Sequence, residues 1–85
     1  MSNESLIIRM RSAINKFRDG SMKAPQLLKE LELGSSALES LAEGELDERR
    51  HLLIEIGISM DLEQEGFASN IEENLDSFKA WLTKA

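Results

Sequence analysis

Eighty-five residues with no cysteine and a single histidine restrict what this chain can do. A chain of this length forms one domain and buries only about 60% of the surface that its unfolded form exposes, which argues against a deep, enclosed active site. The lack of cysteine excludes a disulfide framework and a thiolate nucleophile, and the formal net charge of −6 points away from acidic partners.

The charge is unevenly distributed along the chain. Residues 1–29 hold six lysines and arginines and two acids, a net charge of +4, whereas residues 30–85 hold four and fourteen, a net charge of −10. This asymmetry predicts a basic partner for the acidic part. Uninterrupted apolar runs are far shorter than the roughly 20 residues that span a bilayer, and no signal peptide is visible. We therefore expect a soluble, cytoplasmic protein with no membrane partner.

Two helices are predicted in the first half of the chain. The first runs from about Ser5 to Asp19 and ends at Gly20. Its apolar residues recur on one face at helical spacing: Leu6, Met10, Ala13, Ile14 and Phe17. The second begins near Pro25, which suits a first helical turn, and its leucine stripe continues to Gly44, with Gly34 as a site for a kink.

The third predicted helix starts at an N-cap, Asp47, reaches about Gln64 and is ended by Gly66. Residues 54–63 also alternate between apolar and polar side chains, as a half-buried strand would. A strand needs a partner, and no second stretch alternates over a comparable length. We therefore predict helix for residues 54–63.

This third helix is apolar over most of its circumference, which predicts a central position in the fold. Its solvent-facing side is then a narrow polar strip: Glu48, His51, Glu55, Ser59 and Glu63. Gly57 interrupts the helix at a cost of about 1 kcal/mol relative to alanine. We interpret it as a close helix crossing, with a binding crevice as the alternative.

The fourth predicted helix opens at Ser69, whose spacing to Glu72 fits a capping box. It carries a single apolar face: Ile71, Leu75, Phe78 and Leu82, with Trp81 beside them. Four helices with short connections predict an all-α fold, a small antiparallel four-helix bundle that forms one domain over residues 1–85.

Catalytic and cofactor motifs are weak. The stretch "LGSSALESL" resembles the attachment site of acyl carrier proteins, but Ala37 stands where that family has the modified serine. Ser36 is better interpreted as the cap of the next segment, with Glu39 at capping-box distance. His51 and Glu55 lie one helical turn apart, and a metal site needs more ligands than these two. We predict no enzymatic activity, no cofactor and no metal.

Direct contact with nucleic acid or membrane is also not expected. Arg9, Arg11, Lys16 and Arg18 flank the apolar face of the first helix, a pattern shared by membrane-surface helices, but three other helices need that face for a core. Nucleic-acid binding requires a larger basic surface with stacking aromatics, and the aromatics here are mostly at core-facing positions.

Acidic residues gather on both sides of the connection between the third and fourth helices. Acids at the end of a helix oppose its dipole, so their placement at the end of the third helix is unfavourable and indicates a functional surface, although surface acids often only solubilise. Together with an apolar anchor in the loop, the candidate partner-binding residues are Glu55, Asp61, Glu63, Glu65, Phe67, Glu72, Glu73 and Asp76.

In size, charge and helical layout, and in the apolar-then-acidic stretch "HLLIEIGISMDLEQEGF", the chain resembles small acidic all-helical immunity proteins of bacterial toxin systems of the contact-dependent inhibition, Rhs, Maf or colicin type. The resemblance implies a stoichiometric inhibitor that binds and neutralises a cognate toxin domain, a basic nuclease in many cases. Two alternatives stay open: a helical adaptor or structural bundle that self-associates as a homodimer through the third helix, and an acyl-carrier-like protein.

Overall fold

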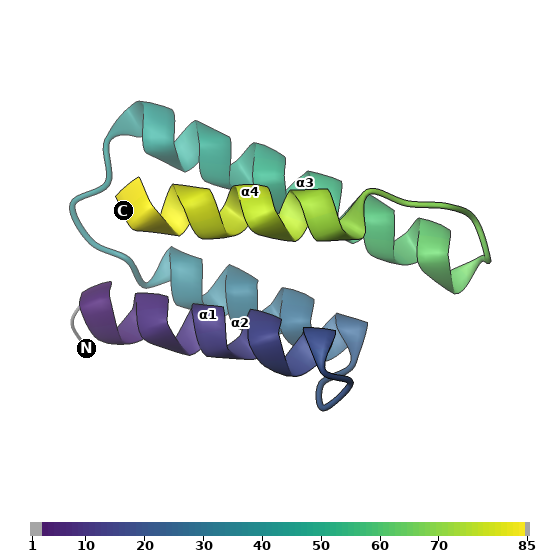
Figure 1. Ribbon diagram of the computed structural model, residues 1–85. Coiled ribbons are helices and arrows are strands. Elements are labelled where there is room, and N and C mark those ends of the chain that lie inside the picture. The colour runs from purple at the N-terminus through teal and green to yellow at the C-terminus, as the bar shows by residue number, and fades with distance from the viewer. Residues whose placement is uncertain (1–2, 85) are drawn as a thin grey trace.

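The computed structural model describes residues 3–84, and within that range it contains four α-helices and no strand. They are α1 (Asn3–Arg18), α2 (Ala24–Ser36), α3 (Glu43–Gln64) and α4 (Ile71–Lys84). The helices form two pairs, α1 with α2 and α3 with α4, and the pairs are joined by contacts of α2 with α3 and of α1 with α4 (Figure 1). The all-helical prediction is confirmed, and residues 54–63 are helical as predicted.

The core lies between the two pairs and takes residues from every helix. Its buried members are Leu6, Met10, Ala13 and Ile14 of α1, Leu27 and Leu31 of α2, Leu52, Ile56 and Met60 of α3, and Ile71, Leu75, Phe78, Trp81 and Leu82 of α4. The predicted apolar faces of the first and fourth helices are thus confirmed, with Phe17 half-buried at the edge. The indole N–H of Trp81 donates to the carbonyl of Glu45 at 3.1 Å, which satisfies the buried donor.

Glycines play different roles at the two ends of the α1–α2 pair. Gly20 has φ +88°, a left-handed conformation that ends α1 as predicted. Gly34 lies inside α2, where a Cβ atom would be 2.7 Å from Cγ of Met10. Gly34 therefore permits close contact between α1 and α2, and α2 runs on through it to Ser36 instead of showing the kink that we predicted there.

The predicted extension of the second helix to Gly44 is wrong, because α2 ends at Ser36. The hydroxyls of Ser35 and Ser36 donate to the carbonyls of Leu31 and Glu32, both at 2.6 Å. Arg49 of α3 donates to the same two hydroxyls at 2.7 and 2.6 Å, so its charge lies at the carboxyl end of α2. Ser36 is thus the last residue of a helix, and it does not cap a following one.

The leucines that suggested a longer second helix lie in the connection to α3. Leu38 is buried and Leu41 is half-buried, so both serve the core without being helical. α3 already begins at Glu43, where the carbonyl of Ala42 accepts the N–H groups of Glu45 and Leu46 at 3.0 and 3.1 Å. Asp47 is therefore inside α3, and its prediction as the N-cap is wrong.

The connection from α3 to α4 ends α3 at Gln64, as predicted, with Gly66 at φ +86°. The predicted capping box does not form. The hydroxyl of Ser69 accepts the N–H of Ile71 at 3.4 Å and donates to the carboxylate of Glu63 at 2.9 Å, while Glu72 pairs with Arg18. Glu72 therefore has a charged partner on α1, Arg18, in place of the local capping interaction with Ser69.

The prediction that α3 is buried all round, with one polar strip facing solvent, is also wrong. Ser59 of that strip is buried, and Asn74 of α4 donates to its hydroxyl at 2.6 Å and to the carbonyl of Glu55 at 3.3 Å. Ile54 and Ile58, which are apolar, are instead 54% and 50% exposed. α4 has packed against the polar strip because Asn74 supplies the hydrogen bonds that burial of a hydroxyl requires.

Candidate functional site

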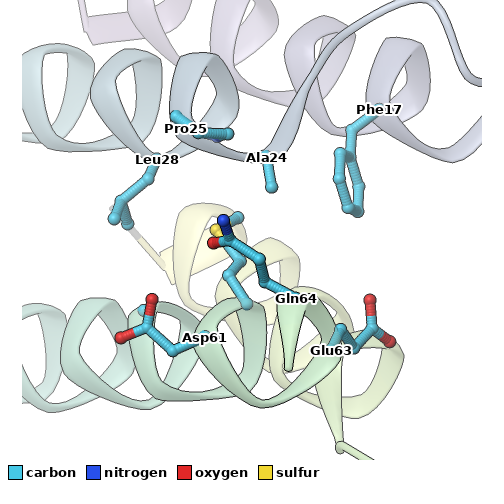
Figure 2. Close-up of a pocket in the computed structure, with 9 residues that line it drawn as sticks. Phe17, Ala24, Pro25, Leu28, Asp61, Glu63 and Gln64 are labelled. Carbon is cyan, nitrogen blue, oxygen red and sulfur yellow. The ribbon is translucent and has the colours of Figure 1, made fainter. Parts of the chain in front are cut away.

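A cleft of about 490 Å³ opens between the α1–α2 turn and the second half of α3 (Figure 2). The first side contributes Phe17, Ala24, Pro25 and Leu28, and α3 contributes Gly57, Met60, Asp61, Glu63 and Gln64. One wall is therefore apolar, and the other combines apolar and polar side chains. Such a mixture of apolar walls and a few polar groups is typical of binding sites.

The local structure on each side positions these side chains. Pro25 stands in the first turn of α2, where its missing N–H leaves no intrahelical bond unmade. In Figure 2, Phe17 and Leu28 point toward α3, and Gln64 reaches into the space between the two sides. In Figure 2, Asp61 and Glu63 lie on either side of Gln64, so the α3 wall carries two carboxylates.

Gly57 lines this cleft on the α3 side. A Cβ atom at Gly57 would meet only Cδ2 of Leu28 within 4 Å, at 3.8 Å, an ordinary van der Waals distance. The packing of the chain therefore tolerates alanine here, although glycine costs about 1 kcal/mol in a helix interior. Of the two interpretations of Gly57, the structure favours the binding crevice over the close helix crossing.

The two sides of the cleft differ in charge: Lys16, Arg18 and Lys23 occur in the sequence of the α1–α2 side, whereas negative charge dominates the half formed by α3 and α4. Residues 51–78 contain seven acids and no lysine or arginine. Within residues 3–84, Asp61, Glu65 and Glu73 are exposed and form no ion pair. A basic protein approaching this half of the molecule meets uncompensated carboxylates, which favour its encounter.

The structure does not gather all eight predicted binding residues into one patch. Glu72 and Asp76 of α4 pair with Arg18 of α1 at 2.9 and 2.7 Å. The hydrogen bond to Asp76 is the main factor that raises the pKa of Arg18; burial opposes it and the charges of Glu72 and Asp76 reinforce it. These two acids therefore connect α1 with α4, and they are less free to meet a partner than our prediction assumed.

The other six predicted residues divide by location. Asp61 and Glu63 border the cleft, although Glu63 also accepts the hydroxyl of Ser69. Phe67 is 62% exposed just beyond Gly66 and remains available as an apolar anchor. The others are Glu55, half-buried beside Asn74, and the exposed Glu65 and Glu73.

Sequence reasoning missed the apolar side of the cleft. Phe17 and Leu28 belong to stripes that were assigned to the core, and Ala24 and Pro25 were considered only as helix-start signals. No local pattern distinguishes a residue that lines a cleft from one that fills a core. The crevice alternative for Gly57 was the one signal that pointed toward this region.

The metal site and the carrier-type site considered from the sequence are not completed by other residues of the described chain. Residues 3–84 contain no group of three or more His, Asp or Glu side chains arranged to hold a metal ion. Ser35, two residues before the carrier-like position Ala37, is 1% exposed and hydrogen-bonded to Arg49. None of the helices within residues 3–84 has the length and apolar character needed to cross a membrane.

Comparisons with protein-family models, curated proteins and solved structures found no match to this chain. Geometry and charge are therefore the evidence for function.

Proposed function

We propose that this protein, acting as a small antiparallel four-helix bundle, is an inhibitor of the immunity type that binds and neutralises a basic toxin domain. The observation that carries the proposal is a cleft with one apolar wall, from α1 and α2, and a second wall on α3 that carries Asp61 and Glu63. That second wall belongs to a stretch of 28 residues, 51–78, that holds no lysine or arginine. Enzymatic activity forms no part of the proposal.

The cleft can bury side chains of the toxin, and such burial slows dissociation of the complex. An apolar or aromatic side chain of the toxin enters between Phe17 and Leu28, where its burial contributes most of the binding energy. A lysine or arginine of the toxin suits the same place, because its aliphatic stem lies on the apolar wall while its charge reaches Asp61 or Glu63. Phe67 adds an exposed apolar contact close to the end of α3.

The unpaired acids supply fast association. Glu65 and Glu73 carry no counter-ion within the described residues, so they extend the negative field beyond the cleft. Such a field accelerates the encounter with a basic surface and is screened by salt. Glu72 and Asp76 contribute less, because Arg18 neutralises part of their charge.

The test pairs the full chain with the toxin domain encoded beside it. Both are co-expressed, growth rescue is scored, and affinity is measured by calorimetry at low and high salt. The variant Asp61→Lys/Glu63→Lys reverses both carboxylates of the cleft. Its control, Glu39→Lys/Glu43→Lys, changes net charge equally at exposed positions outside the cleft.

We expect the cleft variant to lose at least roughly tenfold more affinity than the control, because two charge-assisted contacts become repulsive. We expect growth rescue to fail with the cleft variant and to persist with the control. If the cleft variant and the control lost equal affinity, the interaction would be a non-specific charge attraction and not binding at the cleft. A neighbouring gene product that neither binds nor is neutralised would contradict the proposal.

A further inference from the structure

The exposed side of α3 carries an apolar row, here called the outer stripe: Ile54, Ile58 and Leu62. These residues recur at intervals of four, so they lie along one face of the helix. They are 54%, 50% and 37% exposed. The first of them, Ile54, also borders a hollow beside Leu28 and Glu32 of α2. The exposed large apolar residues of α1 and α2 are isolated ones: Ile8 on α1 and Leu33 on α2, each 61% exposed. A contiguous row is a stronger sign of an interface than such isolated residues.

Opposite charges stand at the two ends of the outer stripe. Arg50 lies one turn before Ile54, and Asp61 lies three residues after Ile58. Eleven residues separate Arg50 from Asp61, about 16 Å along the helix axis, so they do not pair within one chain. Neither forms an ion pair within residues 3–84.

We propose that the outer stripe is the interface of a homodimer in which two α3 helices pack antiparallel about a twofold axis. The axis crosses the stripe midway between Ile54 and Ile58, at the level of residue 56 along the helix. That axis places Ile54 of one copy opposite Ile58 of the other. It also brings Arg50, six residues before the axis, beside Asp61 of the other copy, five residues after it. Both residues lie on the same side of the stripe, so symmetry forms this ion pair twice.

The arrangement also has an unfavourable contact. Asp47 and Glu65 are each nine residues from the axis, so they face each other at the two ends of the interface. Both are exposed, and water and salt weaken their repulsion. Burial of the apolar stripe at the centre must outweigh it, so we expect a reversible dimer.

This dimer does not rest on the proposed inhibitor function. Ile58 and Leu62 line no part of the cleft, and only Asp61 serves both surfaces. A monomeric variant changed at Ile58 therefore retains the cleft and both of its carboxylates. Loss of the dimer and loss of toxin binding are distinguishable in that variant.

The test is sedimentation equilibrium of the full chain over a wide concentration range, with circular dichroism to check folding. We expect the mass to rise with concentration from 9.6 kDa toward twice that value. Ile58→Asp is expected to remain monomeric with unchanged helical content. The matched control, Ile8→Asp, changes an isoleucine on α1 that is 61% exposed, against 50% for Ile58, and is expected to dimerise normally.

Charge reversal tests the register. Arg50→Asp and Asp61→Arg are each expected to weaken the dimer roughly tenfold, because each change creates two like-charge contacts. The double variant Arg50→Asp/Asp61→Arg reverses both partners and is expected to recover wild-type association. A wild-type chain that stays monomeric, an Ile58→Asp variant that still dimerises, or a double variant without recovery would overturn the proposal.

Discussion

α4 and α3 show two ways of using apolar residues in one small protein. α4 buries all its large apolar side chains: Ile71, Leu75, Phe78, Trp81 and Leu82. α3 buries Leu52, Ile56 and Met60 but leaves Ile54, Ile58 and Leu62 in solvent, and it buries the hydroxyl of Ser59 instead. The comparison teaches that the arrangement of neighbours, and not the apolar content of a helix, decides which side chains become core.

The difference has a geometric cause. The apolar residues of α4 lie on one face, and α3 and α1 cover that face. Apolar residues surround most of α3, while within residues 3–84 it packs only against α2 and α4. The surplus apolar surface is therefore available to a partner or to a second copy.

The largest effect on stability is expected from a substitution in the core-facing side of α4. Phe78→Ala is expected to lower the free energy of unfolding by about 3–5 kcal/mol, because Phe78 is fully buried against Trp81. Ile58→Ala on the outer stripe is expected to change it by only about 0.5 kcal/mol or less. Urea denaturation followed by circular dichroism measures both. If both variants lost a similar free energy of unfolding, Ile58 would be as buried as Phe78, and α3 and α4 would not differ in this way.

Gly34 in α2 and Gly57 in α3 differ in the space around them, and the next effect depends on that difference. Gly34→Ala forces a Cβ atom against Met10, an overpacking cost of about 1–3 kcal/mol that exceeds or cancels the gain in helix propensity. Gly57→Ala meets only ordinary contact with Leu28 and is expected to stabilise the protein by about 1 kcal/mol. Thermal unfolding of both variants gives the difference. A destabilised Gly57→Ala would contradict the open cleft.

A smaller effect is expected at the hydrogen bond between the two helices. Ser59→Ala removes the hydroxyl that Asn74 contacts at 2.6 Å, and we expect a loss of about 1 kcal/mol. Asn74 keeps the carbonyl of Glu55, which limits the cost. Ser77→Ala, on an exposed position of α4, serves as the control and is expected to have almost no effect. Denaturant titration of the pair checks this.

The smallest effect lies outside both helices, in the turn after α1. The side-chain and backbone hydrogen bonds of Ser21 lower the pKa of Asp19 below its ordinary value of 3.8. A lowered pKa in the folded state means that Asp19 stabilises the fold above that value, and the contribution is lost as pH falls through the folded pKa. Ser21→Ala is expected to move the Asp19 pKa back upward. Proton titration by NMR measures the shift, and an unchanged pKa would contradict it.

Much of the fold was predictable because local signals and tertiary packing agree. Apolar spacing in α1 and α4, and Gly20 and Gly66 as helix ends, match the structure. The errors arise where a distant residue overrides a local signal. Arg49 takes up the hydroxyls that end α2, Arg18 takes Glu72 away from the capping box, and Asn74 makes Ser59 a buried residue.

The candidate site was predictable only in part. Asp61 and Glu63 were identified from charge, since acids at the end of a helix are visible in the sequence. Their apolar counterpart came from Phe17 and Leu28, about 40 residues earlier, which a stripe pattern assigns to the core. Which acids stay unpaired was also hidden, because Arg18 reaches Glu72 and Asp76 from another helix.

Helical periodicity and charge are properties of the local chain, so they are sufficient to predict that this protein is helical and that its second half is strongly acidic. Only the tertiary structure decided that a cleft opens beside Gly57, that two predicted acids are neutralised and that one face of α3 remains apolar in solvent. These outcomes depend on which helices become neighbours, a choice made by the packing of the whole chain.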